Sequence, residues 1–249
     1  MKKKHIEKIV DMYINKTLKD CYAIDIILNE TPELTDNKLG GYPYLPVGEE
    51  YPLDSDGNPM ALLLQINLSG LNLPCPNSNK ILEIFTTSEL DWPSESKVLL
   101  FDAGLEYQTV FPEIDFSDSI IPECFKIDIE LDRTPMPVTN NEADEILCEI
   151  IQEVTGERPH NSWNYEDDDL FDALFDIHNP SAVLGGYPDF TQDDCRPDDG
   201  TRDYCLFKLD SNLHPSIDLG DCGILTVTMP YVDMLIGKFD NCVMDWDCC

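Results

Sequence analysis

A five-residue segment, Leu-Gly-Gly-Tyr-Pro, occurs twice in this chain, at residues 39–43 and at residues 184–188. Each copy is followed by two apolar runs, and the spacing of the three blocks is nearly the same both times. Such a repeated order of blocks indicates an internal duplication, so we expect two related β-rich halves. The apolar runs cover residues 61–67 and 80–85 after the first copy, and residues 204–210 and 223–228 after the second.

The segment between the two copies has a helical pattern. Apolar residues recur there at the helical period, and Gly156 follows as a stop signal. These helices predict a connector, so the expected fold class is α+β, with two related β-rich halves joined by helices in one compact globular unit. The expected parts are an N-terminal amphipathic helix (1–20), a first β-rich half (21–138), a helical connector (139–180) and a second β-rich half (181–249).

Charge is the strongest signal in the composition. Lys and Arg number 16 and Asp and Glu number 49, which gives a net charge of -33. Such a field repels nucleic acid and anionic membranes and attracts a basic protein. Solubility, adaptation to high salt or a bias shared by a whole proteome would explain the same charge. No stretch approaches the roughly 18 apolar residues of a membrane-spanning helix, so no membrane span is expected.

The ten cysteines are scattered and include no Cys-x-x-Cys spacing. Glu7, Lys8 and Asp11 interrupt any apolar stretch that would make the N-terminal segment a secretory signal. We therefore expect reduced thiols in a cytoplasmic protein. The adjacent Cys248 and Cys249 are either a frayed end or an exception to this expectation.

The residues around the two repeats resemble the YwqG-like proteins, a bacterial family of unknown function. The family segment Ser/Thr-Lys-x-Gly-Gly-x-Pro-x-Leu-Pro is similar to the residues from Lys38 to Pro46, and Gln-Ile-Asn at 65–67 also fits. The chain departs from the family at Tyr51, where Trp is frequent, and at Lys208, where Gln is frequent. The second signature, Gly-Tyr-Pro-x-x-x-Gln-x-Asp-x-Arg, matches residues 186–188, Gln192, Asp194 and Arg196.

The resemblance implies an α+β fold with two related sheets, and it implies no reaction. Such domains are found near polymorphic-toxin and immunity genes, so the resemblance implies a role in interaction or immunity. The chain also lacks nucleophile-elbow, P-loop and dinucleotide fingerprints. None of its four histidines is paired at metal-ligand spacing. We therefore predict a non-enzymatic protein of the immunity type, without a cofactor, whose acidic surface neutralises a basic partner such as a toxin.

The alternative is a small-molecule- or metal-binding protein, or an enzyme, with a cleft between the halves where the two repeat loops meet. A purely structural role for both loops, as corners of the repeat, is the competing interpretation. The candidate residues of the cleft are Lys38, Gly41, Tyr42, Gln65, Tyr187, Gln192, Asp194, Arg196 and Lys208.

Four aspartates crowd the loop after the second repeat and could bind a divalent cation through oxygen ligands. A solvated acidic loop is the interpretation that we favour, and Asp194 and Arg196 could instead form an ion pair that holds the loop. The four residues are Asp193, Asp194, Asp198 and Asp199.

Overall fold

The computed structural model of the protein describes residues 2–76, 78–87, 95–162 and 168–249. Ten strands form one sheet in the order β10-β9-β8-β7-β1-β6-β2-β3-β4-β5, and all neighbouring strands are antiparallel. The strands are β1 (Lys19–Ile26), β2 (Lys38–Leu39), β3 (Ala61–Asn67), β4 (Lys80–Thr86), β5 (Ser96–Asp102), β6 (Phe125–Thr134), β7 (Ala182–Gly185), β8 (Tyr204–Asp210), β9 (Ile224–Met229) and β10 (Val243–Asp247). The helices are α1 (Lys3–Thr17), α2 (Ala143–Thr155), α3 (Asp168–Phe175) and α4 (Tyr231–Ile236), with short 3-10 helices at Phe116–Asp118 and Ser211–Leu213.

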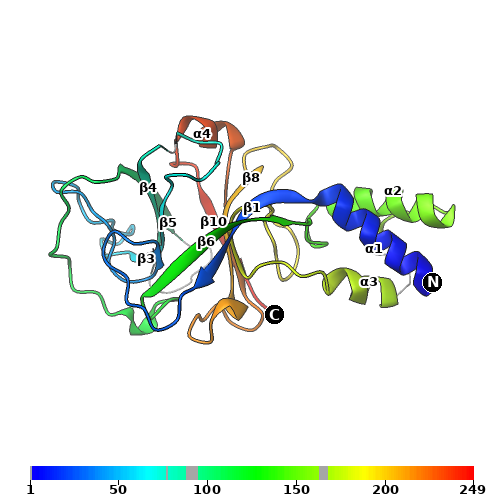
Figure 1. Ribbon diagram of the computed structural model, residues 1–249, viewed down its shortest axis with the longest axis horizontal. Coiled ribbons are helices and arrows are strands. Elements are labelled where there is room, and N and C mark those ends of the chain that lie inside the picture. Colours follow the sequence, from blue (N-terminus) through cyan, green and yellow to red (C-terminus); the bar gives the residue numbers. More distant parts are fainter. Residues whose placement is uncertain (1, 77, 88–94, 163–167) are drawn as a thin grey trace.

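The predicted fold class, two β-rich halves joined by helices in an α+β fold, is wrong. The strands form a single sheet, and its first arm (β2–β5) and second arm (β7–β10) meet across the central strands β1 and β6. Backbone hydrogen bonds between strands therefore join the arms, and the helices do not. Helices α2 and α3 instead lie beside α1 at one end of the molecule (Figure 1). The prediction failed because α2 and α3 separate the two arms in the sequence but not in space. The chain leaves the sheet after β6, forms these helices, and returns to the sheet at β7.

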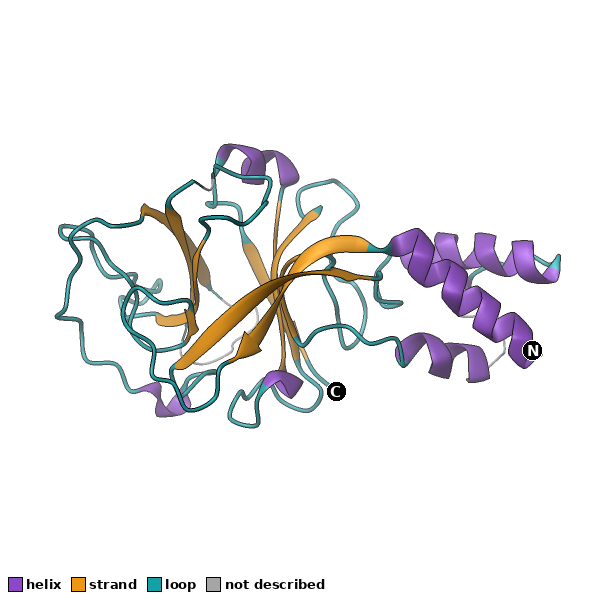
Figure 2. Ribbon diagram, viewed as in Figure 1, coloured by secondary structure: helices purple, strands orange, loops and turns teal. Residues whose placement is uncertain are grey.

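One hydrophobic core serves both arms. It contains Leu64 and Ile84 from the first arm together with Leu206 and Val227 from the second. The sheet must therefore fold over so that the same face of both arms meets, and Figure 2 shows it strongly twisted and coiled. Strand β6 alternates in its first half, since Phe125 and Ile127 contribute to this core while Asp128 is exposed.

The three longer helices form a second cluster with a core of its own. Ile9 and Tyr13 of α1 are buried against Leu147 of α2 and Leu170 of α3. The Tyr13 hydroxyl donates a hydrogen bond of 2.9 Å to the carbonyl oxygen of Met136, which ties α1 to the chain just after β6. Helices α1 and α2 thus bury their apolar stripes, whereas α3 buries Leu170 and Leu174 and leaves Phe175 56% exposed. In the described part of the chain, no helix is long and apolar enough to cross a membrane.

The glycines of the first repeat make a turn that other residues would not fit. Gly40 and Gly41 both have positive φ angles, of 70° and 73°. A Cβ atom on Gly40 would collide with the carbonyl oxygen of Glu123, and one on Gly41 would lie 2.5 Å from the Sγ atom of Cys124. Glycine is required here for both its backbone conformation and its close approach to the segment before β6.

Candidate functional site

Two of the predicted site residues lie in a row of buried polar side chains across the first arm. Lys38 of β2 pairs with Gln65 of β3, which pairs with Glu83 of β4. Side chains of paired residues in an antiparallel sheet lie on the same face, so the three are neighbours. All three are buried, and Glu83 has no exposed surface. We call these three residues the polar row.

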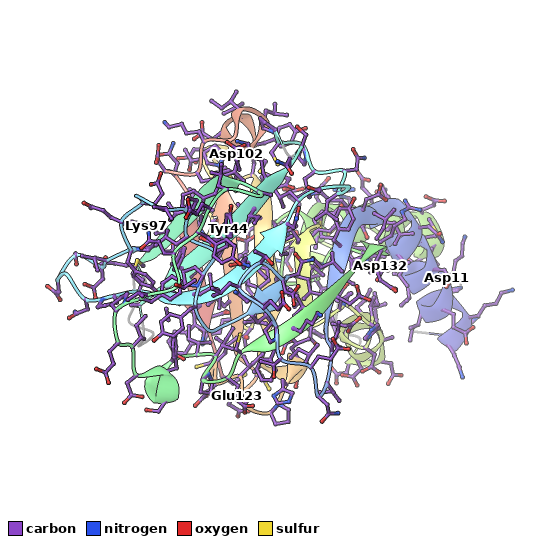
Figure 3. The ribbon with its side chains drawn as sticks, turned by 60° about the vertical axis from the view of Figure 1, so that its left-hand side comes forward. Asp11, Tyr44, Lys97, Asp102, Glu123 and Asp132 are labelled. Atoms are coloured by element: carbon purple, nitrogen blue, oxygen red, sulfur yellow. The ribbon has the colours of Figure 1, made fainter. Side chains whose placement is uncertain are left out.

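The amide of Gln65 connects the sheet to the loops on either side of β2. Its Nε2 atom donates hydrogen bonds of 2.8 Å to the carbonyl oxygens of Leu34 and Asp36. Its Oε1 atom accepts a hydrogen bond of 2.6 Å from the backbone N–H of Tyr44. Figure 3 shows Tyr44 lying over the strands of the first arm. Because these bonds hold loops in place, they give Gln65 a structural role in this conformation.

Burial changes the charge states of the other two members of the polar row. It lowers the pKa of Lys38 to about 8, although the nearby carboxylate of Glu83 opposes this shift. Burial also raises the pKa of Glu83 well above its usual range, against the opposing effect of Lys38. Neither carboxyl oxygen of Glu83 has a hydrogen-bond partner among the described residues. The pair could hold a proton, but a ligand cannot touch Glu83 unless the covering loops move.

The other first-arm candidates have packing partners. The ring of Tyr42 stacks on Phe111, with 4.9 Å between ring centroids and an angle of 12°. The Tyr42 hydroxyl donates a hydrogen bond of 3.3 Å to the carbonyl oxygen of Pro112. Gly41 lies against Cys124. These contacts give Gly41 and Tyr42 roles in building the loop over the first arm.

Most of the second-arm candidates are also engaged within the protein. The backbone N–H of Gln192 donates to the carboxylate of Asp247 at 2.8 Å, and its side-chain amide donates to the carbonyl oxygen of Cys248 at 2.7 Å. The ring of Tyr187 lies under the ammonium group of Lys19, with 4.7 Å between the nitrogen and the ring centroid. Gln192 therefore fixes the C-terminal strand to the repeat loop.

Asp194 and Arg196 form a bidentate ion pair, which confirms the ion pair given above as the alternative to a metal site. The Nε atom of Arg196 lies 2.9 Å from Oδ1 of Asp194, and Nη2 lies 2.6 Å from Oδ2. Burial by itself would raise the pKa of Asp194, but hydrogen bonds from Arg196 and from the backbone of Asn141 hold it below its usual value. The carboxylate is thus already occupied by a cation.

The aspartate cluster has no arrangement typical of a metal site. Asp199 accepts hydrogen bonds from the backbone N–H and the hydroxyl of Thr201, at 3.0 and 2.6 Å. Across the ranges that the structure describes, no group of three or more His, Cys, Asp or Glu side chains is placed to hold an ion. Asp193 and Asp198 remain loop residues with no further assignment.

Lys208 lies at a pocket of the second arm. Its side chain is 4% exposed, and its Nζ atom lies 3.7 Å from Oδ2 of Asp189. The pocket has a volume of about 450 Å³ and is enclosed by the second arm, the segment 136–139 and the end of α3. None of its lining residues comes from the first arm. The structure thus places Lys208 away from Lys38, Tyr42 and Gln65, with which a shared cleft was predicted.

Sequence reasoning missed two acids of low exposure, the buried Glu83 and the partly buried Asp189. Glu83 is a single acid within the apolar run at 80–85, and Asp189 directly follows the second repeat. A carboxylate inside a buried strand is costly unless it is paired, so the interrupted apolar run was a usable signal for Glu83. Nothing local distinguishes Asp189 from the many other aspartates of the chain.

The exposed side of the central strands carries unpaired acids. Asp25 of β1 lies directly opposite Asp128 of β6, and Glu130 and Asp132 continue along the same side of β6. All four are exposed. Among the described residues, no Lys or Arg forms an ion pair with any of them. We call Asp25, Asp128, Glu130 and Asp132 the acidic face.

A family model described as a domain of unknown function (DUF1963) matches residues 37–248. The chain belongs to the DUF1963 family. The match covers every strand from β2 to β10, and therefore includes the polar row, the Lys208 pocket and most of the acidic face. A comparison of this DUF1963 chain with curated proteins finds no match.

Proposed function

We propose that this DUF1963 protein is a non-enzymatic binding protein whose acidic face engages a basic protein. The observation that carries the proposal is the direct opposition of Asp25 and Asp128 on the exposed side of β1 and β6. Like charges in this position destabilise a strand pair. A basic partner would relieve that repulsion, so binding would gain from a cost already present in the free protein.

The net charge of -33 supports the same proposal at longer range. Complementary charge speeds the encounter of two proteins and makes the association rate fall with added salt. The resemblance to YwqG-like proteins favours a toxin as the basic partner and the cytoplasm as the place of binding. On this proposal the protein is of the immunity type and covers the active surface of its partner.

The test is co-purification of the tagged full chain with the products of neighbouring genes, at low and at high salt. Three exposed acids of the acidic face are neutralised together in one variant, and three exposed acids elsewhere are neutralised in a matched control with the same net charge. The test variant is Asp128→Asn, Glu130→Gln and Asp132→Asn, and the control is Asp11→Asn, Glu50→Gln and Glu106→Gln.

Figure 3 shows Asp132 on β6 and Asp11 on α1, at separate places on the surface. We expect recovery of a basic partner at low salt, with a clear loss for the test variant and little loss for the control. Equal recovery with both variants would mean that net charge alone acts, and the acidic face would then not be the site. Failure to recover any basic protein at low salt would contradict the proposal altogether.

A further inference from the structure

Lys208 has hydrogen-bonding capacity that the protein does not use. It lies on β8, its side chain is 4% exposed, and its nearest charged partner, Asp189, is 3.7 Å away. That distance is beyond a hydrogen bond. The Nζ atom donates no hydrogen bond to another described residue, although an ammonium group has three N–H donors. Lys208 lines the pocket, so these donors are available to an acceptor bound there.

The same pocket contains an unused acceptor. The Oδ1 atom of Asn179 is buried and has no hydrogen-bond partner among the described residues. Asn179 and Lys208 both line the pocket. The pocket therefore offers an unfilled donor and an unfilled acceptor together. Hydroxyl groups both donate and accept hydrogen bonds, so a ligand with more than one hydroxyl group would suit both residues.

The remaining lining is partly apolar. Val138, Ile177 and Ile224 contribute to the walls, and Phe175 at the end of α3 is 56% exposed beside them. The volume of about 450 Å³ is within the range typical of small-molecule sites. A ligand with one apolar side would bury it against these residues.

The charges around the pocket indicate that the ligand is neutral. Asp189 and Asp210 line it and disfavour an anion, as does the net charge of the chain. The ammonium group of Lys208 disfavours a metal cation at the same place. The carboxylate of Asp189 is already held by the hydroxyl of Thr139 at 3.1 Å and by the N–H of Phe190 at 3.0 Å.

We propose that this pocket binds a neutral ligand with several hydroxyl groups on an apolar ring or chain, that is, a sugar or a polyol. Lys208 donates to one ligand oxygen, Asn179 accepts from a ligand hydroxyl, and the apolar side of the ligand lies against Ile177 and Phe175. The site is separate from the acidic face, so it does not depend on a basic partner.

The test is titration of the isotope-labelled full chain, followed by NMR, with three neutral probes: methyl glucoside, N-acetylglucosamine and myo-inositol. Glucuronate and glucosamine are the anionic and cationic comparisons. We expect saturable shift changes at residues 189–191 and 208–212 with a neutral probe, and weaker binding of both charged sugars. Lys208→Met should weaken binding by roughly tenfold or more, as expected for the loss of a hydrogen bond to a charged group.

Lys80→Met is the matched control, because Lys80 forms an ion pair at the far side of the first arm and should not affect binding. Asn179→Leu is a second variant that leaves the Lys208–Asp189 pair intact, and it should also weaken binding. Lack of saturable binding by all three neutral probes would mean that the pocket holds only water and would overturn the proposal. Equal binding of glucuronate, or binding unchanged in both pocket variants, would overturn it as well.

Discussion

Glu83 is a carboxyl group buried inside β4 without a hydrogen-bond partner in the described structure. Burial raises its pKa well above the usual value of 4.5, so the folded state binds its proton more tightly than the unfolded state does. The folded state is then favoured at low pH, and this contribution to stability is lost as the pH rises above about 4.5. Glu83→Gln removes the titrating group.

We therefore expect the free energy of unfolding of the natural protein to fall, relative to Glu83→Gln, as the pH rises from about 5 to about 7. The slope of the difference can reach about 1.4 kcal/mol per pH unit. Urea unfolding of both proteins across this range measures it. Parallel curves would show that Glu83 is ionised in the folded state and that the prediction is wrong.

Gly40 offers a second prediction about a single residue. Gly40→Ala would combine a positive φ angle with a collision against the carbonyl oxygen of Glu123. Gly48→Ala is the matched control, because Gly48 has a φ angle of 97° and no atom within 4 Å of the added Cβ. Both variants bear the backbone strain, and the overpacking in Gly40→Ala should add about 1–3 kcal/mol of destabilisation.

Chemical denaturation of the two variants gives this difference directly. An equal loss of stability would show that the backbone conformation alone requires glycine at residue 40, and that the segment before β6 can move away.

At the scale of elements, the repulsion between Asp25 of β1 and Asp128 of β6 should lower the free energy of unfolding of the protein. Asp128→Asn should raise the free energy of unfolding by about 0.2–1 kcal/mol, because it removes a like-charge pair with Asp25. Asp11→Asn on α1 is a control for the change in net charge, and it should have a smaller effect. Urea unfolding at low salt measures both, and an Asp128→Asn variant no more stable than the control would contradict the cross-strand repulsion.

The individual elements were largely predictable from local patterns. The amphipathic helix expected within residues 1–20 formed as α1, and the helical pattern between the two repeats formed as α2 and α3, because the apolar residues of each recur at the helical period. Strand β2 was not recognised as a strand, since Lys38 and Leu39 are too short a segment to show any period. The order of strands was not predictable either, because it depends on pairings between β1 and β6 that are distant in sequence.

The candidate site shows the same limit. The family resemblance drew attention to Lys38, Gln65 and Lys208, and each is buried. Their separation into the polar row and the Lys208 pocket depends on which strands are neighbours. Glu83 joins the polar row, and Asp189 joins the Lys208 pocket, only through contacts between segments that are distant in sequence. The sequence therefore identifies single candidate residues but does not show which of them lie together.

For the whole molecule, the net charge of -33 predicts that salt stabilises the fold. Repulsion among so many acids disfavours a compact chain. Raising the ionic strength from about 0.01 to about 0.15 M shortens the Debye length from about 30 to about 8 Å, which screens charges between separate elements. We expect a higher urea midpoint in sodium chloride at the second concentration, with an unchanged dependence of stability on urea. A lower midpoint would indicate that attractive ion pairs outweigh the repulsion.

The place of β1 at the middle of the sheet also determines the order of events during synthesis. Tyr22 pairs with Leu131 on one side and with Leu184 on the other, so both neighbours of β1 are translated much later. At about 5–20 residues per second, the ribosome reaches β7 roughly eight to thirty seconds after it has made β1. Throughout that interval the nascent chain carries a strand with at least one open edge, which is a template for wrong pairing. The strand at the centre of the fold is thus made before both of its partners, and its pairing is complete only after β7 has been made.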